Sequence, residues 1–396
     1  MRIIIVTTRV PYPPHKGDKL KIYNIVRHLA GQNKVKVLCL SRGPSESELL
    51  SGIRALGAEI ETVQHSMLRS LLGAFLGLFS RRPLQVSLYR SGKLGRRLAE
   101  IVRDEEPDVV YYHFIRSAQY IEYVDRNRTV NVLDFTDAVS LYLTRFIDAV
   151  RNPLTKFMIR FERGRISGYE HIAERFDTAF ICSEFDRDYL KGKGIKANFQ
   201  ILPNAVDTES FSRSDVGVDQ KRIIFTGNMP YFPNEDAVLH FTRKIFPDIL
   251  AVIPDAKLFL VGRKPTRKIR KLASENVIVT GFVEDIVTEY QKSAVAIAPT
   301  RFGAGTLNKV IEPIVLGVPV VATSIAVRGL PARVQRYVQV AQSDAEFSAK
   351  VVELLKKGAE GRVSTVSELD EVRAALSWKT VVSEFETYLK SRTRPG

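Results

Sequence analysis

The chain contains 396 residues, of which 45% are hydrophobic and 26% are charged. This composition supports a packed core and excludes disordered and collagen-like classes of protein, while the length predicts two or three domains. The 59 Lys and Arg residues outnumber the 44 Asp and Glu residues, which gives a formal net charge of +15. Such an excess favours acidic partners, namely phosphorylated small molecules, anionic lipids or nucleic acids.

Cysteine usage and hydropathy predict a cytoplasmic location. Cys39 and Cys182 are the two cysteines and lie in apolar, strand-like runs, which excludes a disulfide scaffold and fits a reducing compartment. The apolar run 3–6 is too short for a signal peptide, and no run approaches the ~20 apolar residues of a membrane span. Within 67–97, however, an apolar stretch precedes several basic residues, a pattern suited to adsorption on an anionic membrane surface such as the inner face of the plasma membrane. The alternative is a helix pair at a domain edge with a solvated basic face.

The first half of the chain alternates apolar runs with segments of helical periodicity. The unbroken apolar run 2–7 predicts a strand buried on both faces, and a loop, a helix over 20–30 and a strand over 35–40 follow it. These elements form a β-α-β unit, which indicates a doubly wound sheet. Further strands are expected at 58–63, 109–113, 131–134 and 178–182.

A second alternation begins after the polar stretch 207–221. The chain therefore predicts an α/β protein with two Rossmann-like domains, 1–205 and 206–377, whose parallel sheets face each other across a cleft. In the second domain, strands are expected at 222–226, 257–261, 277–280, 295–299 and 318–323, and helices at 235–246 and 308–316, with a last helix at 369–389.

Ligands of open α/β sheets bind beyond the carboxyl ends of the strands, and two segments there are suited to an anion. Gly17, with Asp18 and Lys19, stands at the start of a helix, where the backbone can approach a phosphate. The alternative for this segment is a plain turn. In the second segment Gly303 and Gly305 free the backbone before another helix. That helix start carries Thr306, Leu307, Asn308 and Lys309.

Lys309 and Glu312 stand on one face of the expected helix. The lysine completes an anion cradle, and the carboxylate is suited to sugar or ribose hydroxyls; the alternative is a surface ion pair. A dehydrogenase is disfavoured because Asn308 replaces the third glycine of the dinucleotide fingerprint, and no phosphate-binding P-loop motif is present.

Other candidate residues end strands of both domains. Gly227 and Asn228 form a turn that either lines a ligand or only shapes the loop, and Arg263 is suited to phosphate oxygens. His113 and Asp137 follow neighbouring strands of the first domain, so both can reach one site, although a lone histidine is more often a packed residue. Ser183 before Asp186 predicts a helix cap rather than a metal site.

Taken together, the motifs resemble glycosyltransferase family 4, the retaining sugar transferases of the GT-B fold. Among them the chain looks most like the enzymes associated with exopolysaccharide export (PEP-CTERM-type) gene clusters. The resemblance covers nearly the whole chain. It is carried by the segments 11–19, 134–137, 202–207, 225–234, 280–285, 303–312 and 317–323.

The resemblance implies a UDP- or GDP-sugar donor bound by the second domain and no metal or cofactor. Gly17 would contact the diphosphate, Val283 would meet the base, and Glu312 would contact the ribose hydroxyls. The family's other signature glutamate falls at Ala304, so the sugar contact passes to the backbone of 305–307 or to another side chain. The family's basic pair is also missing, and Lys309 and Arg263 would neutralise the phosphates instead. The last helix, from about residue 378, would return to the first domain.

We therefore expect a glycosyltransferase that builds a cell-surface polysaccharide or its lipid-linked precursor. Lys309 would stabilise the leaving group, and His113 or Asp137 would orient the glycan or lipid-linked acceptor, or relay its proton. The alternatives are a nucleotide-sugar 2-epimerase of the same fold and a non-catalytic nucleotide-sugar-binding protein. Nucleic-acid binding is disfavoured, since no basic helix or aromatic–basic RNA motif is present.

Overall fold

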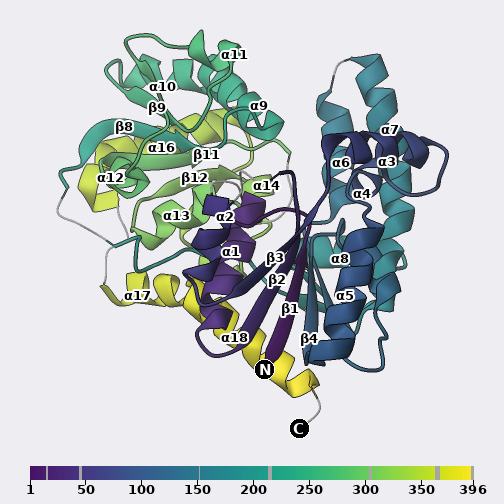
Figure 1. The fold of residues 1–396 in the computed structure, drawn as a ribbon. Coiled ribbons are helices and arrows are strands. Elements are labelled where there is room, and N and C mark those ends of the chain that lie inside the picture. The colour runs from purple at the N-terminus through teal and green to yellow at the C-terminus, as the bar shows by residue number, and fades with distance from the viewer. Residues whose placement is uncertain are drawn as a thin grey trace. The chain divides into compact units, whose positions relative to one another are not determined.

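The computed structural model describes residues 1–14, 17–43, 47–150, 152–212, 216–302, 306–361 and 366–393 (Figure 1). The chain divides into two compact units. Unit 1 comprises Met1–Pro203 and Val381–Gly396, and unit 2 comprises Asn204–Thr380. The sequence analysis had placed the corresponding boundaries at 205/206 and at about 378.

Unit 1 is built on a parallel seven-stranded sheet in the order β3-β2-β1-β4-β5-β6-β7. Its strands are β1 (Arg2–Thr7), β2 (Lys34–Ser41), β3 (Glu59–Gln64), β4 (Val109–His113), β5 (Val130–Thr136), β6 (Thr178–Ile181) and β7 (Phe199–Ile201). Its helices are α1 (Gly17–Ala30), α2 (Ser47–Arg54), α3 (Met67–Leu78), α4 (Leu84–Ser87), α5 (Gly92–Glu105), α6 (Val139–Ala149), α7 (Pro153–Tyr169) and α8 (Glu184–Gly192). Ile3, Ile4, Ile5 and Val6 have no exposed surface, as expected for a strand covered on both faces.

Unit 2 is built on a parallel six-stranded sheet in the order β10-β9-β8-β11-β12-β13. Its strands are β8 (Asp219–Thr226), β9 (Lys257–Val261), β10 (Val277–Gly281), β11 (Ser293–Ala298), β12 (Val320–Thr323) and β13 (Val338–Ala341). Its helices are α9 (Phe232–His240), α10 (Phe246–Val252), α11 (Arg267–Arg270), α12 (Ile286–Gln291), α13 (Asn308–Val315), α14 (Ser324–Val327), α15 (Ala332–Gln335), α16 (Asp344–Lys357) and α17 (Val366–Ala375). Along β8, Ile223 and Phe225 pack into one apolar cluster and Ile224 into another, so successive side chains bury opposite faces of the sheet.

The strand order reverses between β1 and β4 in unit 1 and between β8 and β11 in unit 2. In doubly wound sheets, the carboxyl ends of strands beside such a reversal are the usual place of a ligand. The segments that follow β1, β4, β8 and β11 are therefore where a functional site is expected in each unit.

Two expected helices differ from the structure. The helix expected at 235–246 is interrupted by a π-helical turn, Phe241–Ile245, before α10. Pro247 in the first turn of α10 lacks the N–H that would continue a regular helix, which accounts for the interruption. The single helix expected at 369–389 is two helices, α17 and α18 (Trp378–Arg392). The backbone between them bonds to Val206 instead: Val206 N–H donates to Leu376 O at 2.7 Å, and Trp378 N–H donates to Val206 O at 3.1 Å.

The short strands β7 and β13 were not expected from the sequence. Helix α18 starts in unit 2, which includes Trp378, and continues in unit 1 from Val381. None of the helices in the described part of the chain is long and apolar enough to cross a membrane.

Candidate functional site

Lys309 provides a buried positive charge at the carboxyl edge of the unit 2 sheet. It is the second residue of α13, which follows β11, and only 9% of its surface is exposed. Its Nζ donates a hydrogen bond to Asn234 Oδ1 and lies 4.6 Å from the centre of the Phe225 ring. Burial lowers the pKa of Lys309 to about 7, although the charge of Glu312 opposes that shift. Since no carboxylate among the described residues forms an ion pair with it, this ammonium group is suited to a bound anion.

Glu312, one turn further along α13, is held by a short chain of hydroxyl groups. Tyr290 Oη donates to Glu312 Oε2 at 2.9 Å and lies 2.6 Å from Thr226 Oγ1, at the end of β8. Burial raises the pKa of Glu312, while hydrogen bonds from Tyr290 and Asn308 and the charge of Lys309 act against that rise. The carboxylate is thus fixed in orientation at the same edge as Lys309, and its remaining acceptor positions are available to ligand hydroxyl groups.

Two glycines, Gly227 and Gly262, let the loops at this edge pack closely. A Cβ atom on Gly262, whose φ is +157°, would lie 1.8 Å from Gly227 O, and one on Gly227 would lie 2.6 Å from Asn234 Nδ2. Gly262 N–H donates to Gly281 O at 2.8 Å, which joins the ends of β9 and β10. Asn234 Nδ2 also donates to Asn228 O at 3.0 Å. Gly227 and Asn228 therefore shape the loop that carries Asn234 to Lys309.

The remaining candidates of unit 2 lie around this group in different ways. Arg263 is exposed, and its guanidinium carbon lies 4.5 Å from the centre of the Phe282 ring, while the neighbouring Val283 is half-buried. Thr306 is buried, and its hydroxyl donates to Gly329 O at 2.7 Å. Leu307 precedes α13 directly, and Asn308 is its first residue. Gly303 and Gly305, like Ala304, lie outside the described residues.

A second polar cluster occupies the carboxyl edge of the unit 1 sheet, around Asp134 of β5. Asp134 accepts hydrogen bonds from Lys21 Nζ at 3.0 Å and from Tyr111 Oη at 2.5 Å. His113 Nδ1, at the end of β4, lies 3.5 Å from the same carboxylate. Burial alone would raise the pKa of Asp134, but the charge of Lys21 and the neighbouring His113 hold it well below its ordinary value. Asp134 is therefore a buried carboxylate held by Lys21 and Tyr111, with the His113 ring beside it.

Asp137 lies beside this cluster, in the turn after β5. Burial, and then the neighbouring Asp186, raise the pKa of Asp137 to about 6, although Cys182 Sγ donates a hydrogen bond to it at 3.1 Å. Thr136, just before it, has a φ of +63°, an unusual backbone conformation for a residue with a side chain. Asp186 itself belongs to the predicted helix cap, since its N–H donates to Ser183 Oγ at 3.1 Å, and the capping prediction is confirmed.

The loop after β1 brings Lys19 to the same edge as His113. Both side chains line a small depression, together with Arg9 and Arg116, and Lys19 Nζ donates to Tyr12 O at 3.2 Å. Gly17 is exposed at the start of α1, and no described atom lies within 4 Å of the place a Cβ would take. Asp18 is the second residue of that helix.

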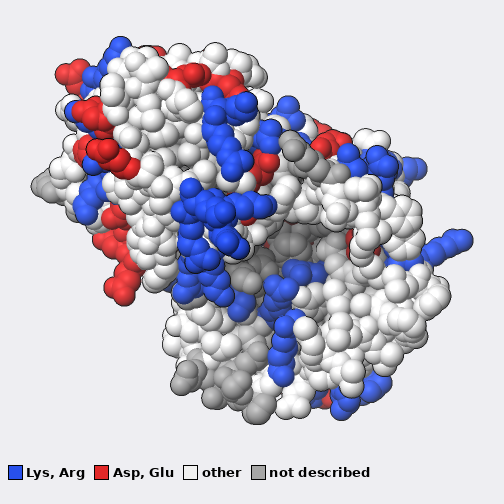
Figure 2. All heavy atoms as spheres, turned by 90° about the horizontal axis from the view of Figure 1, so that it is seen from above, with Lys and Arg blue, Asp and Glu red and all other residues white. Residues whose placement is uncertain are grey.

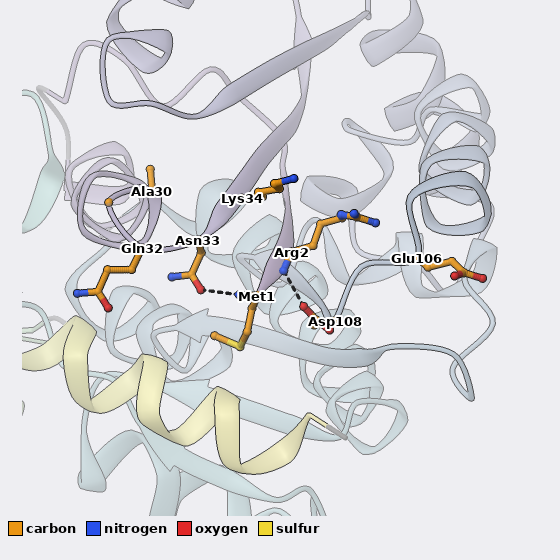
Figure 3. Close-up of a pocket in the computed structure, with 9 residues that line it drawn as sticks. Met1, Arg2, Ala30, Gln32, Asn33, Lys34, Glu106 and Asp108 are labelled. Atoms are coloured by element: carbon orange, nitrogen blue, oxygen red, sulfur yellow. Dashed lines mark hydrogen bonds between the residues drawn. The ribbon is translucent and has the colours of Figure 1, made fainter. Parts of the chain in front are cut away.

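A broader depression lies at the opposite, amino-terminal edge of the unit 1 sheet (Figure 3). The Met1 amino group donates to Asn33 Oδ1 at 3.1 Å, and Arg2 N–H donates to Asp108 Oδ2 at 2.6 Å. These polar groups satisfy one another, and they lie away from the strand ends where α/β sheets bind ligands. We therefore do not assign this depression to the functional site.

Comparisons with known proteins agree with this geometry. The family model "Glycosyltransferase Family 4" matches residues 22–210, and the model "Glycosyl transferases group 1" matches residues 220–357. The chain is a family 4-like glycosyltransferase. It is 23% identical over 381 residues to an uncharacterized 44.6 kDa protein in the cps region of Klebsiella pneumoniae. The aligned region covers 90% of this chain and 91% of that protein.

Solved structures show that this glycosyltransferase has the GT-B fold. Anabaena Alr3699/HepE in complex with UDP has a TM-score of 0.68 at 13% identity, with 99% of this chain and 100% of that chain covered. Sucrose-phosphate synthase from Thermosynechococcus elongatus has a TM-score of 0.70 at 13% identity, with 99% of both chains covered.

Some polar residues of this glycosyltransferase were not among the candidates from sequence. The Lys309 ammonium group is hydrogen-bonded to Asn234, and Glu312 accepts a hydrogen bond from Tyr290. Lys21 donates to Asp134, the neighbour of His113. For Lys21 a signal was present, because it is a charged residue between the apolar Leu20 and Ile22 in the first turns of the expected helix. Its partner, however, lies 113 residues further along the chain.

Proposed function

We propose that this glycosyltransferase transfers a sugar, with retention of anomeric configuration, from a nucleoside diphosphate sugar to a glycan or lipid-linked acceptor. The observation that carries the proposal is the buried Lys309 ammonium group beside the oriented Glu312 carboxylate at the edge of the unit 2 sheet. Anabaena Alr3699/HepE, of the same fold, is described in complex with UDP and with UDP-glucose, which supports a UDP-sugar here, with a GDP-sugar as the alternative.

The charges of unit 2 suit the departure of a nucleoside diphosphate. As the sugar–phosphate bond breaks, the sugar becomes oxocarbenium-like and negative charge builds up on the phosphate oxygens. Lys309 and the N–H groups at the start of α13 would stabilise that charge without a metal ion, because they are already oriented in a poorly hydrated place. Loss of one such group costs ~3 kcal/mol of transition-state stabilisation in comparable sites. Glu312 would accept hydrogen bonds from the ribose hydroxyls, Val283 would meet the base and Gly17 the diphosphate.

The acceptor is assigned to the carboxyl edge of unit 1. With a pKa of about 6, Asp137 is mainly ionised at neutral pH and has a basicity suited to accepting a proton from a hydroxyl group. His113, whose Nδ1 lies 3.5 Å from Asp134, would position the same hydroxyl. We also propose that the reaction takes place in the cytoplasm, which the buried Cys39 and Cys182, thiols that form no disulfide, support.

The proposed product is a cell-surface polysaccharide or its lipid-linked precursor. The Klebsiella pneumoniae relative that aligns with 90% of this chain is named after the cps region, and this supports a surface polysaccharide as the product. Extracts of surface glycans and lipid-linked saccharides are therefore the acceptors to test.

Donor binding is tested with a thermal-shift panel of UDP- and GDP-sugars. A ligand at a hundred times its dissociation constant stabilises the folded state by ~2.7 kcal/mol, which is readily measured. Lys309→Met should abolish the shift. Lys292→Met removes a half-buried lysine from the same unit and should leave the shift unchanged. Equal shifts for both variants would remove Lys309 from the donor site.

Product analysis then separates the possible reactions. A transferred sugar whose anomeric configuration matches the donor supports the proposal, and inversion contradicts it. Release of an epimerised sugar without acceptor would identify a 2-epimerase. Saturable donor binding without hydrolysis or transfer, whatever the acceptor, would identify a binding protein.

A further inference from the structure

Helix α3 of unit 1 presents large apolar side chains to solvent on most of its surface. Ser70 and Gly77 are its buried residues. A Cβ atom on Gly73 would lie 2.6 Å from Ser87 O, and one on Gly77 would lie 2.7 Å from Ser87 Oγ, so α3 rests on α4 through small residues. The exposed residues are Met67, Leu68, Leu71, Leu72, Phe75, Leu76, Leu78 and Phe79, from 46% to 80% exposed. A helix that packs on its own domain normally buries its large apolar side chains, whereas α3 exposes them and buries small residues.

Helix α7 adds a second apolar stripe beside the end of α3. Arg165 of α7 donates to Gly77 O at 2.8 Å and to Leu78 O at 2.7 Å, and thereby caps the last turn of α3. The ribbons of α3 and α7 lie side by side in Figure 1. The stripe has the i, i+3, i+4, i+7 spacing of one helix face. It consists of Leu154, Phe157, Met158 and Phe161, which are 44% to 69% exposed.

A cationic pocket of about 480 Å³ adjoins the exposed apolar surface of α3. Leu72 and Leu76 of α3 form part of its wall. Among the described residues that line it, none is acidic. Its charged side chains are Arg69, Arg82, Arg90, Lys93 and Arg96. Apart from Arg82, which lies 3.6 Å from Glu122, the described contacts include no ion pair for any of the five.

We propose that α3, α7 and this pocket form a docking surface for an anionic lipid bilayer. The apolar side chains of α3 and α7 would lie among the acyl chains at the interface, and the pocket would hold a lipid phosphate headgroup. The proposal goes beyond the donor chemistry and does not depend on it. An apolar surface beside clustered cations is the arrangement that binds anionic membranes from one side.

Other occupants of this surface are less suited to it. A twelve-residue helix such as α3 extends ~18 Å, which is too short to cross the ~30 Å hydrocarbon core. A second copy of the chain would bring like charges together, because its own pocket carries the same cations and its net charge is +15. On the face drawn in Figure 2, Lys and Arg side chains gather in several blue groups, in keeping with the net charge of +15.

The test is flotation of the full chain, without any donor, on phosphatidylcholine vesicles with and without phosphatidylglycerol. Binding is expected only with phosphatidylglycerol and should weaken with salt. Each cation near an anionic surface contributes about fivefold to partitioning, so Arg90→Gln/Lys93→Gln/Arg96→Gln should lower binding about a hundredfold. Lys244→Gln/Arg270→Gln/Lys271→Gln is the matched control and loses the same charge from exposed positions of unit 2.

The apolar part is tested with Leu68→Ser/Phe75→Ser, which changes two exposed residues and should abolish flotation. Val252→Ser changes a 53% exposed residue of unit 2 and should leave flotation unchanged. Donor binding in the absence of lipid should stay unchanged in all these variants, which separates this proposal from the proposed function. Flotation that ignores phosphatidylglycerol, or equal losses in the two triple variants, would overturn the headgroup site. No flotation at all, or a dimer in sedimentation velocity that Leu68→Ser/Phe75→Ser dissociates, would overturn the membrane assignment.

Discussion

Donor affinity is expected to fall as the pH rises above 7, because binding requires the charged form of Lys309. Burial lowers the pKa of this lysine from 10.5 to about 7, so about half of the unliganded molecules carry the charge at neutral pH. A diphosphate placed beside the ammonium group favours the charged form and raises its pKa again. Above pH 7, each molecule must therefore take up a proton in order to bind, and this cost grows with pH.

The magnitude follows from the two pKa values. If the bound donor returns the pKa of Lys309 to its ordinary 10.5, the dissociation constant rises ~50-fold between pH 7 and about pH 9, or ~2 kcal/mol. Below about pH 6 the affinity should be nearly constant, since the free protein is then already protonated.

Isothermal titration calorimetry with a nucleoside diphosphate sugar measures this effect directly. Such a donor is preferable to a free nucleoside diphosphate, whose terminal phosphate titrates nearby. Titrations at pH 8 in buffers of different ionisation enthalpy should show uptake of close to one proton per donor bound. Lys309→Met should bind weakly and without this pH dependence. A wild-type affinity that stays flat from pH 7 to about pH 9, with no proton uptake, would show that Lys309 does not face the phosphates.

The buried Lys309 should also lower the stability of the folded protein, because charging it at pH 7 costs about 4 kcal/mol. Lys309→Met is therefore expected to raise the melting temperature at pH 7, and the stability of the wild-type protein should increase as the pH rises from 7 to about 10. An unchanged or lower melting temperature of Lys309→Met contradicts this prediction. Asp137→Asn should slow sugar transfer by ~10²-fold or more without weakening donor binding. In a pH–rate profile, the variant should lack the rise in rate that the wild-type protein shows near pH 6. An unaltered profile excludes Asp137 as the base. Gly262→Ala should lower the melting temperature and the donor affinity, because its Cβ would lie 1.8 Å from Gly227 O at a φ of +157°. Gly217→Ala is the control, since no described atom lies within 4 Å of its Cβ, and it should change neither the melting temperature nor the donor affinity.

The doubly wound architecture was predictable because its strands are buried on both faces. The unbroken apolar run that became β1 and the shorter apolar run 223–225 within β8 have few other stable structures available, and the helix at Asn308 is preceded by the apolar strand β11. β7 and β13 were missed because each has three or four residues, one of them a glutamine, and edge strands carry little apolar pattern. The break before α18 could not be foreseen, since it depends on hydrogen bonds to Val206.

For the candidate site, the sequence indicated residue types at strand ends but not their partners. Lys309 and Glu312 share one helix, so their proximity follows from helical spacing alone. The contact of Lys309 with Asn234 spans 75 residues, and that of Lys21 with Asp134 spans 113. Burial of a lysine depends on such tertiary packing, and hence its lowered pKa could not be derived from sequence. Whether the predicted residues bind a donor stays a prediction.

The last segment of the chain belongs to the first unit, and this has a consequence for biosynthesis. Phe385 packs against Tyr111 and Phe180 of the unit 1 sheet, and Glu386 accepts a hydrogen bond from Asn33 at 3.1 Å. Unit 2 is continuous in sequence, and all of its residues are translated before this segment. The amino-terminal unit therefore cannot complete its packing until the last segment has been made, although its strands are translated first, and until then its Tyr111 and Phe180 lack the Phe385 ring that packs on them.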